Sequence, residues 1–522
     1  MVLFDIFVSK KHYFTTAFFM RLFKKTMDPV SKTLSIAIVA ATGAYSFWLF
    51  GQVQGIFGGI LFVCEMLMSS TALLFIFNHW TQDHTFRTQQ APKGSLDIFV
   101  TVVNEPLSIF TPTVEAASKI NYQNKKLYIL DDGGREDVQK IAAFYGATYI
   151  SRHEKVDRKA GNLNAGLAHS KGMYVLVLDA DQVATSNIAE DLLGYFRNDK
   201  NIAIISTRQQ FDVPINDFNH DIAFYQHAQA GKNADNAAIS CGSGVFYRRT
   251  ALLSIGGFQT WNIVEDLYTS YVLHSRGWKS IYINKAYTIG TAPLDIPMIY
   301  KQRGTWALDT LRLFIKKSPF LEPGLSFRQK MHYTEMAWAY IVPALGVATL
   351  FLLPAIALFF NVHMVANELQ YLYFRVTFIS LLLVFFYRLN GNSLVSTQYW
   401  GALSFIYLHA LMKAVCTNDM RYRVTEKFSS MDTEIKRILP HLLYVLVNAG
   451  ALLWYISYNG PTLSPYFLYV NTVWTILMLL CFFPIIKKGL FPRSIALHTS
   501  TELLSLEEPL NLLKFKQRIE QI

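Results

Sequence analysis

Six long apolar runs constrain this chain more than any other feature. Each run is near or above the roughly 20 residues that a helix needs to cross the hydrocarbon core of a bilayer. Over the whole chain 52% of the residues are hydrophobic, which exceeds the usual share in a soluble domain. The pattern therefore predicts an integral membrane protein. The runs are residues 33–51, 55–79, 334–360, 371–388, 438–458 and 466–486.

The distribution of Lys and Arg orients these runs. Residues 1–32 and 417–437 are rich in Lys and Arg. The positive-inside rule therefore places both termini, and the long segment between the second and third runs, in the cytoplasm. A seventh apolar stretch, residues 395–416, carries polar side chains and predicts a helix lying at the membrane interface, since a seventh span would break this charge pattern. The linkers that contain no Lys or Arg are residues 51–54, 361–370 and 459–465.

The runs divide the chain into segments. The net charge of +11 suits cytoplasmic loops beside anionic lipid, and nucleic-acid binding is disfavoured because the charge lies next to the spans. Four scattered cysteines lack the spacing of a metal site or a disulfide framework. The expected segments are an amphipathic interface segment at 1–32, two transmembrane helices in 33–80, a cytoplasmic domain ending in interface helices at 91–330, two transmembrane helices in 331–388, an interface helix and a loop at 389–437, two transmembrane helices in 438–486 and a cytoplasmic tail at 487–522.

Strand-like and helix-like patterns alternate in the first half of the polar insert. Such alternation predicts a doubly wound α/β domain with a mostly parallel sheet. Most of the strand-like runs lead directly into acidic residues, and ligands of open α/β sheets bind at the carboxyl ends of the strands. We therefore expect a site at this edge. The strand-like runs are residues 96–103, 126–130, 147–150 and 174–179.

Two carboxylates one residue apart, Asp179 and Asp181, follow the apolar run at 174–178. Oxygen ligands of this kind suit Mg²⁺ or Mn²⁺, which complete their coordination with substrate phosphates. Taken alone, the pattern also describes a strand followed by an acidic turn. The order of the flanking motifs favours the metal site.

Three further motifs follow along the chain. Residues 240–244 form a small-residue turn that lets a ligand approach the backbone closely. Asp266 is a candidate general base or, alternatively, a helix cap. Trp306, in a Gln-Arg-x-x-Trp stretch, is a candidate binding residue or a core or interfacial aromatic residue.

Together these motifs resemble the processive family-2 glycosyltransferases, the group of cellulose, chitin, hyaluronan and curdlan synthases. The resemblance covers residues 30–490 and implies a glycosyltransferase A-type α/β domain inserted between transmembrane helices. The matching motifs, in order, are Asp-Asp-Gly at 131–133, Lys-Ala-Gly-Asn at 159–162, Asp-Ala-Asp at 179–181, Cys-Gly-Ser at 241–243, Glu-Asp at 265–266 and Gln-Arg-x-x-Trp at 302–306.

The resemblance implies a role for each motif. The donor would be a UDP-sugar, with UDP-glucose favoured, and the product would be a β-linked polysaccharide that is passed across the plasma membrane. Asp179 and Asp181 would hold Mg²⁺ or Mn²⁺, and Asp266, ionised at rest, would be the general base. The donor-binding residues would be Glu105, Asp132, Lys159 and Arg303. The acceptor-binding residues would be Cys241, Gln302 and Trp306.

Two details refine the resemblance. A segment near residue 425 resembles the Phe-x-Val-Thr-x-Lys gating-loop motif of the cellulose synthase branch, and the corresponding residues are Tyr422, Val424, Thr425 and Lys427. Thr305, however, stands where the family has an Arg that contacts the leaving diphosphate. Without this Arg, the positive charge beside the diphosphate would have to come from Arg303 or a gating-loop residue. The absence of this Arg also favours a product other than cellulose, such as a capsular or curdlan-type glucan.

Other functions remain open at this stage. A non-processive family-2 transferase that adds one sugar to a lipid carrier would share Asp132 and the Asp179/Asp181 pair, but it would not need the Gln-Arg-x-x-Trp or gating-loop motifs. A hyaluronan- or chitin-type synthase is disfavoured by the gating-loop motif. A transporter or scaffold with a degenerate transferase domain is disfavoured because the set of acidic residues is complete. The sequence leaves the sugar, the linkage, branching, accessory subunits and the oligomeric state open.

Overall fold

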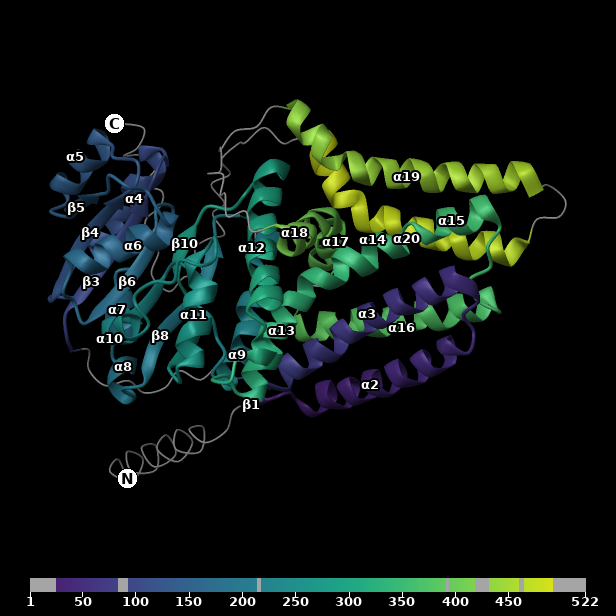
Figure 1. Ribbon diagram of the computed structural model, residues 1–522, viewed down its shortest axis with the longest axis horizontal. Coiled ribbons are helices and arrows are strands. Elements are labelled where there is room, and N and C mark those ends of the chain that lie inside the picture. The colour runs from purple at the N-terminus through teal and green to yellow at the C-terminus, as the bar shows by residue number, and fades with distance from the viewer. Residues whose placement is uncertain are drawn as a thin grey trace, which may run out of the picture.

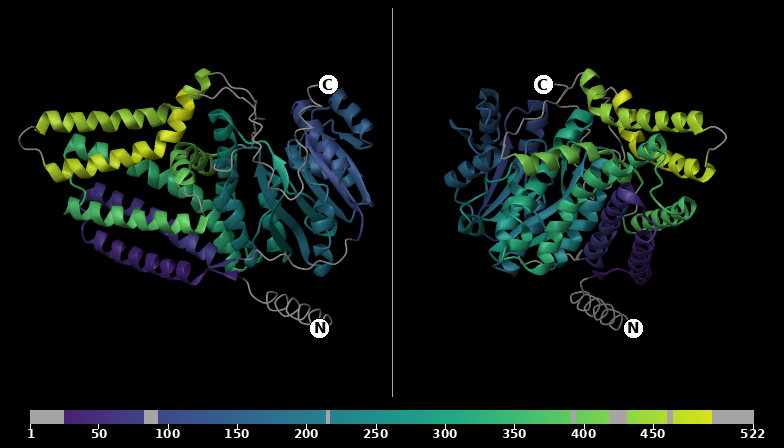
Figure 2. Two further views of the ribbon diagram at one scale, coloured as in Figure 1. Left: turned by 180° about the vertical axis from the view of Figure 1, so that it is seen from behind. Right: turned by 45° about the vertical axis from the view of Figure 1, so that its right-hand side comes forward.

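The computed structural model describes residues 25–82, 93–213, 217–390, 394–417, 431–459 and 464–491. A domain built on a β-sheet occupies one end of the molecule, and a bundle of long helices occupies the other (Figure 1). Views from behind and from the side show the same division (Figure 2). The chain enters and leaves the sheet domain from the bundle, as expected for an insert between membrane spans.

A single eight-stranded sheet, in the order β5-β4-β3-β6-β9-β8-β10-β7, forms the core of the first part. The run β5-β4-β3-β6 is parallel, as the alternating sequence pattern predicts, and β8 is parallel to β10. Strand β9 is antiparallel to both neighbours and β7 is antiparallel to β10, so the sheet is mixed. The strands are β3 (Leu96–Val102), β4 (Lys125–Asp131), β5 (Thr148–Ser151), β6 (Tyr174–Asp179), β7 (Val183–Ala184), β8 (Ile202–Phe211), β9 (Val245–Arg248) and β10 (Lys279–Gly290).

Both faces of the sheet are buried. In β3, Ile98 and Val100 face one hydrophobic cluster while Phe99 faces another, because side chains alternate across a strand. Helix packing on both faces explains why every residue of β3 is buried and why its sequence does not alternate between apolar and polar side chains. The helices of this domain are α4 (Leu107–Ser118), α5 (Glu136–Phe144), α6 (Arg158–His169), α7 (Ile188–Leu192), α8 (Tyr195–Asn198), η1 (Phe218–His220), η2 (Ala223–Ala228), α9 (Gln229–Ala234), α10 (Arg249–Ser254), α11 (Glu265–Ser275), α12 (Ile296–Lys316) and η3 (Pro319–Leu321).

Six helices in the described residues are long and apolar enough to cross a membrane, the number that the sequence predicts. They run side by side away from the sheet domain (Figure 1). A two-residue ribbon of β1 (Lys25–Thr26) and β2 (Thr81–Gln82) joins the near ends of the first two. The six are Pro29–Phe50 (α2), Gly55–Trp80 (α3), Phe327–Phe360, Glu368–Arg388 within α16 (Glu368–Asn390), Glu434–Tyr458 within α19 (Met431–Asn459) and Pro465–Leu490 (α20).

The third span differs from the others in continuity and burial. It is assembled from α13 (Phe327–Ile341), the π-helical turn η4 (Val342–Val347), α14 (Ala348–Leu350) and α15 (Leu353–Phe360). Within its most apolar stretch 72% of the residues are buried by protein, against 28–39% in the other five spans. The third span is therefore the packed centre of the bundle, whereas the others present most of their surface outward.

Three helices lie between the sheet domain and the spans. The predicted interface helix at 395–416 is two helices, α17 (Leu394–Ala402) and α18 (Ser404–Cys416), with a break at Leu403. In Figure 1, α12 runs across the direction of the spans and α18 lies next to it. A Cβ at Gly304 of α12 would lie only 3.0 Å from a side-chain carbon of Ile406 of α18, which shows how closely the two helices pack. This layer brings α12 to the carboxyl edge of the sheet.

Candidate active site

The carboxyl end of β4 presents two acids with different partners. The carboxylate of Asp131 accepts hydrogen bonds from the backbone N–H groups of Gly133 and Arg135, so it shapes the turn. Asp132, predicted to bind the donor, forms a two-pronged ion pair with Arg152, with N–O distances of 2.8 and 2.7 Å. No sequence pattern points to Arg152, because its partner lies 20 residues away. Paired in this way, the Asp132 carboxylate is held in one orientation.

Glu105, at the end of β3, is half-buried, and one of its carboxylate oxygens accepts the backbone N–H of Val103 at 2.8 Å. Strands β3 and β4 are neighbours in the sheet. The predicted donor residues Glu105 and Asp132 therefore follow adjacent parallel strands at the same edge.

The predicted metal ligands lie at the end of β6. Asp179 is its last residue, and one oxygen of its carboxylate lies 2.6 Å from Nζ of Lys159. The hydroxyl of Thr291, just beyond β10, donates to Asp181 at 2.5 Å. Thr291 could not be picked out from sequence, since it lies 110 residues from Asp181. The two carboxylates thus share one edge of the sheet with the donor residues.

The Cys241–Ser243 turn connects this edge to the rest of the site. The carbonyl of Gly242 accepts a hydrogen bond from Lys159 at 3.0 Å, and the Ser243 hydroxyl accepts the backbone N–H of Asp179 at 2.9 Å. Gly242 has a φ of 79°, and a Cβ there would come within 2.9 Å of an Asp266 carboxylate oxygen. Only glycine combines this conformation with such a close approach.

Lys159 is the electrostatic centre of the site. Besides Asp179, its Nζ lies 3.0 Å from a carboxylate oxygen of the buried Glu265. Burial lowers the pKa of Lys159, but the charges of Asp179 and Glu265 outweigh burial and hold the pKa well above its ordinary value. Lys159 therefore carries a permanent positive charge between the predicted metal ligands and Asp266.

Asp266, the predicted general base, lies in the first turn of α11. The cap position itself is Val264, whose side chain makes no capping hydrogen bond, while Asp266 accepts the N–H of the following residue at 2.6 Å. Burial and then the charge of Glu265 raise the pKa of Asp266 to about 8, although Lys159 lowers it. The raised pKa favours the protonated form of Asp266 in the ligand-free protein, and its ionisation at rest stays a prediction.

Asp309 of α12, which the sequence analysis missed, supplies the cap that Val264 lacks. Its buried carboxylate accepts the backbone N–H groups of Ile263 and Val264 at 3.3 and 2.6 Å. The carbonyl oxygen of Asp309 also accepts the side-chain amide of Asn262 at 3.1 Å. Asp309 lies three residues after Trp306, so it ties the predicted acceptor helix to the start of the helix that carries Asp266.

We expect Asp309→Asn to lower kcat by about 10–100-fold, because the amide cannot accept both N–H groups and Asp266 shifts against the acceptor. The affinity for UDP should not change. Asp309 in its charged form also raises the pKa of Asp266, although burial raises the pKa of Asp309 itself to about 7. The variant should therefore also move the acidic limb of the kcat/KM profile to lower pH, which a purely structural effect would not do. Asp295→Asn, at the N-cap of the same helix, is the matched control.

The predicted acceptor residues on α12 do not all face the same way. Trp306 lies beside Arg303, whose guanidinium carbon is 4.8 Å from the Trp306 ring centroid. Arg303, predicted to contact the donor, forms an ion pair with Asp221 at 2.5 Å. Gln302 is half-buried. The Thr305 hydroxyl bonds to its own helix, at the carbonyl of Lys301, and so brings no charge in place of the family Arg.

A cavity of about 680 Å³ unites the acceptor side of the site with the membrane helices. Its wall includes Cys241, Asp266 and Trp306 at one end, and it continues past Tyr407 to Trp474 of α20. Gln302 is not among the described residues that line it. Burial raises the pKa of the Cys241 thiol to about 12, so this thiol stays neutral as a wall residue. The predicted gating-loop residues Tyr422, Val424, Thr425 and Lys427 lie outside the described residues.

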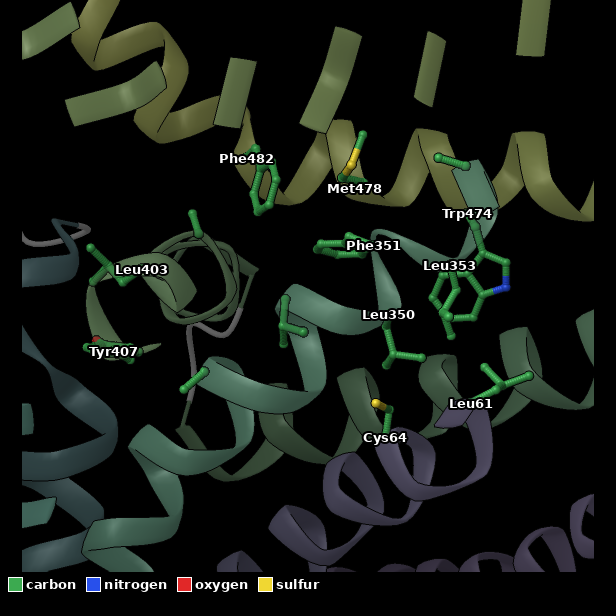
Figure 3. Packing of buried hydrophobic residues seen from close by; sticks show 14 of the residues in the cluster. Leu61, Cys64, Leu350, Phe351, Leu353, Leu403, Tyr407, Trp474, Met478 and Phe482 are labelled. Carbon is green, nitrogen blue, oxygen red and sulfur yellow. The ribbon is translucent and has the colours of Figure 1, made fainter. Parts of the chain in front are cut away.

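Most of the cavity wall is apolar and comes from several helices. Figure 3 shows the hydrophobic cluster that contributes to this wall, with Leu350 and Phe351 of the third span and Trp474 of α20 converging. The cavity thus passes between membrane helices rather than opening sideways from the sheet domain.

Two family models match adjoining parts of the chain. Residues 97–256 match the model of glycosyl transferase family 2, and residues 254–436 match the model of cellulose synthase. The catalytic subunit of cellulose synthase 1 [UDP-forming] from Komagataeibacter xylinus is 27% identical over 420 residues, covering 76% of this chain and 56% of that protein. The cellulose synthase catalytic subunit [UDP-forming] from Pseudomonas fluorescens (strain SBW25) is 29% identical over 323 residues, covering 58% of this chain and 44% of that protein. The chain thus spans about half the length of these relatives.

A solved structure shows the same fold. The mannosyltransferase PcManGT from Pyrobaculum calidifontis, in complex with GDP-Man and Mn²⁺, superposes with a TM-score of 0.53 at 16% identity, covering 69% of this chain and 99% of that one. The two family matches adjoin within the sheet domain and together take in every predicted site motif from Asp132 to the gating loop. The chain is a membrane protein with a glycosyltransferase A-type domain, in which a match to glycosyl transferase family 2 is followed by a match to cellulose synthase.

Proposed function

We propose that this protein is a processive, inverting glycosyltransferase that polymerises UDP-glucose into a β-linked glucan and passes the polymer across the plasma membrane. The observation that carries the proposal is the cavity that joins Asp266 and Trp306 to the membrane helices. A transferase that adds a single sugar needs a place for one acceptor. It does not need a path of about 680 Å³ leading from its base into the bilayer.

The carboxylates at the end of β6 fit a divalent cation. Asp179 and Asp181 supply hard oxygen ligands, and Lys159 lies 2.6 Å from Asp179, where it would share the charge of a bound diphosphate. Mg²⁺ or Mn²⁺ held by these two carboxylates would take its other ligands from substrate phosphates. When bound, the cation would neutralise charge on the leaving diphosphate.

The chain's own residues account for the remaining chemistry. Asp132 and Glu105 would accept hydrogen bonds from the uridine. Trp306 would stack on the terminal sugar of the acceptor, and Asp266 would take the proton of its hydroxyl group. The hydroxyl oxygen forms a bond to the anomeric carbon while the bond from that carbon to the diphosphate breaks, and UDP leaves with the bonding electrons. A single displacement inverts the anomeric centre, so an α-linked donor gives a β-linked product.

The topology proposed for this reaction follows the charge pattern. The sheet domain and both termini are placed in the cytoplasm, where UDP-sugars are made, and the linkers without Lys or Arg are placed outside. A polar polymer cannot cross hydrocarbon unless protein lines its path. The cavity among the spans provides such a lining.

Incubation of the purified, detergent-solubilised chain with UDP-glucose and Mg²⁺ tests the proposal. We expect UDP release together with a high-mass product that β-glucanases digest. A low-mass, lipid-linked product would instead select the single-sugar transferase. Absence of any transfer from UDP-glucose would contradict the choice of donor.

A further inference from the structure

Asp221 is the acid that pairs with Arg303 in the cavity wall. Its carboxylate lies 2.5 Å from Nη1 of Arg303, whose side chain is 9% exposed. Both residues line the cavity together with Trp306. A buried Arg that is already paired with a carboxylate has little free positive charge to offer to a leaving diphosphate. The ion pair therefore indicates a role for Arg303 other than the donor contact that its motif predicts.

The guanidinium group of Arg303 lies close to two aromatic rings. Its central carbon is 4.8 Å from the ring centroid of Trp306 and 5.6 Å from that of Phe218 in η1. Phe218 in turn stacks on Tyr399 of α17, with ring centroids 3.7 Å apart and ring planes 10° from parallel. A guanidinium group attracts aromatic faces within about 6 Å of their centroids. Because Asp221 holds the guanidinium group, it restricts the position of the Trp306 ring as well.

The backbone of Asp221 connects η1 to η2. Asp221 has a φ of 43° and a ψ of 52°, in the left-handed region that Asp and Asn adopt more readily than other residues with a side chain. Its N–H group donates to the carbonyl of Phe218 at 3.0 Å, and its carbonyl accepts the N–H groups of Phe224 and Tyr225, each at 2.9 Å. These hydrogen bonds fix the turn from which the carboxylate reaches Arg303.

The segment that follows Asp221 is also connected to the turn beside the predicted base. The hydroxyl of Tyr225 donates to Oε1 of Gln209 at 2.9 Å, and Nε2 of Gln209 donates to the carbonyl of Cys241 at 2.8 Å. Cys241 begins the small-residue turn that approaches Asp266. Contacts from the Asp221 segment therefore reach both the acceptor helix α12 and the surroundings of the base.

We propose that Asp221 is a positioning residue for the acceptor: through Arg303 it holds the Trp306 ring in the orientation that presents the acceptor hydroxyl group to the base. The inference rests on the proposed function, in which Trp306 stacks on the terminal sugar of the acceptor. It places Arg303 on the acceptor side of the reaction and not beside the leaving diphosphate. Neither Asp221 nor Arg303 exchanges a proton with the substrate.

Asp221→Asn tests the proposal, because Asn tolerates the left-handed conformation and keeps an oxygen for Arg303 while the charge is lost. The purified variant is given UDP-glucose and, as acceptor, oligosaccharides obtained by partial hydrolysis of the wild-type polymer. We expect an unchanged KM for UDP-glucose, a higher KM for the acceptor and a kcat of transfer lower by about 10–100-fold, since a misplaced acceptor reacts slowly. Hydrolysis of UDP-glucose needs no acceptor sugar and should continue, so the ratio of transfer to hydrolysis should fall.

Two further variants separate positioning from a general loss of structure. Asp217→Asn is the matched control, because Asp217 accepts the N–H group of Asn219 at 2.8 Å in the same turn and is not the partner of Arg303. It should keep the wild-type ratio of transfer to hydrolysis. The double variant Asp221→Asn/Arg303→Gln leaves no buried charge unpaired. We expect its melting temperature to return to the wild-type value while its ratio of transfer to hydrolysis stays low.

Arg303→Lys distinguishes the acceptor side from the donor side. Lys keeps a positive charge for Asp221 but loses the planar group that faces the aromatic rings. We expect a lower ratio of transfer to hydrolysis and an unchanged affinity for UDP, measured by calorimetry with Mn²⁺. A marked loss of UDP affinity would return Arg303 to the diphosphate and overturn the inference. If Asp221→Asn does not accumulate, this variant takes its place.

The remaining outcomes are equally clear. A wild-type ratio of transfer to hydrolysis in Asp221→Asn would overturn the inference. Recovery of that ratio in the double variant would do the same, because it would show that only the unpaired charge was harmful. Absence of polymer from the wild type with UDP-glucose would contradict the proposed function instead.

Discussion

Replacement of Asp266 by Asn should lower kcat by about 10²–10⁴-fold, the usual contribution of a general base. The substitution keeps the size of the side chain and the oxygen that accepts the N–H of Leu267, so α11 should begin as before. Only the ability to take a proton is lost. Glu265, the neighbouring carboxylate, cannot substitute, because it is buried and paired with Lys159.

The pH profile provides an independent signature. The pKa of Asp266, about 8, lies above its ordinary value of 3.8. The stability that its proton contributes is therefore complete below pH 3.8 and is lost as the pH rises through about 8. Activity runs the opposite way, since the base must be ionised, and kcat/KM of the wild type should rise with pH up to about pH 8. The Asn variant should lack this limb.

Two measurements complete the test of Asp266. UDP affinity, measured by calorimetry, should be unchanged in the Asn variant, since the predicted uridine contacts, Glu105 and Asp132, follow β3 and β4. Near-wild-type polymer yield from Asp266→Asn would reject the catalytic role. Equal loss of UDP binding would assign Asp266 to the donor side instead.

Asp181→Ala should reduce polymer formation by about 10³-fold or more, because a site with two protein carboxylates loses one of them and the charge on the leaving diphosphate is no longer offset. The side chain contacts Thr291 at the surface of the domain, so its loss should leave the sheet intact. Asp199→Ala is a suitable control, since Asp199 pairs with Lys279 outside the site. Chelation of the wild type with EDTA should have the same effect, reversed by excess Mg²⁺ or Mn²⁺.

Binding measurements separate the metal role from a structural one. Mn²⁺ should strengthen UDP binding to the wild type and to Asp199→Ala, but much less to Asp181→Ala. Full polymer yield in EDTA would remove the metal assignment. A stable Asp181→Ala protein that retains its activity would do so as well.

Features that depend on neighbouring residues could be predicted from the sequence, whereas features that depend on distant residues could not. Motifs that are visible within one short segment were found: Asp179 and Asp181 follow an apolar strand, and the parallel strands β3 to β6 alternate with helices. Pairings between residues far apart in the chain were not found. The antiparallel insertion of β9 beside β6 joins residues some 70 positions apart, and no periodicity in either segment indicates it.

The same limit explains the site residues that were missed. Asp309 acts on backbone groups more than 40 residues away, and Arg152 reads as an ordinary surface Arg until Asp132 is seen beside it. Arg303 was assigned to the donor from its motif alone. Its ion pair with Asp221, across 82 residues, appears only once α12 is packed. The pKa of Asp266 likewise depends on burial, which no single segment specifies.

The burial of the third span by protein determines which amino-acid substitutions this protein should tolerate. Its most apolar stretch is 72% buried by protein, whereas the other spans turn most of their residues outward. In a saturation mutagenesis experiment, exchanges among Leu, Ile, Val and Phe should be nearly silent in α2, where lipid adapts to any apolar shape. The same exchanges around Gly346, which lies against α3, should behave like core mutations of a soluble protein. Hydropathy marks both spans as apolar enough to cross a membrane but does not show which of them is covered by protein, so the fitness map would reveal which span holds the bundle together.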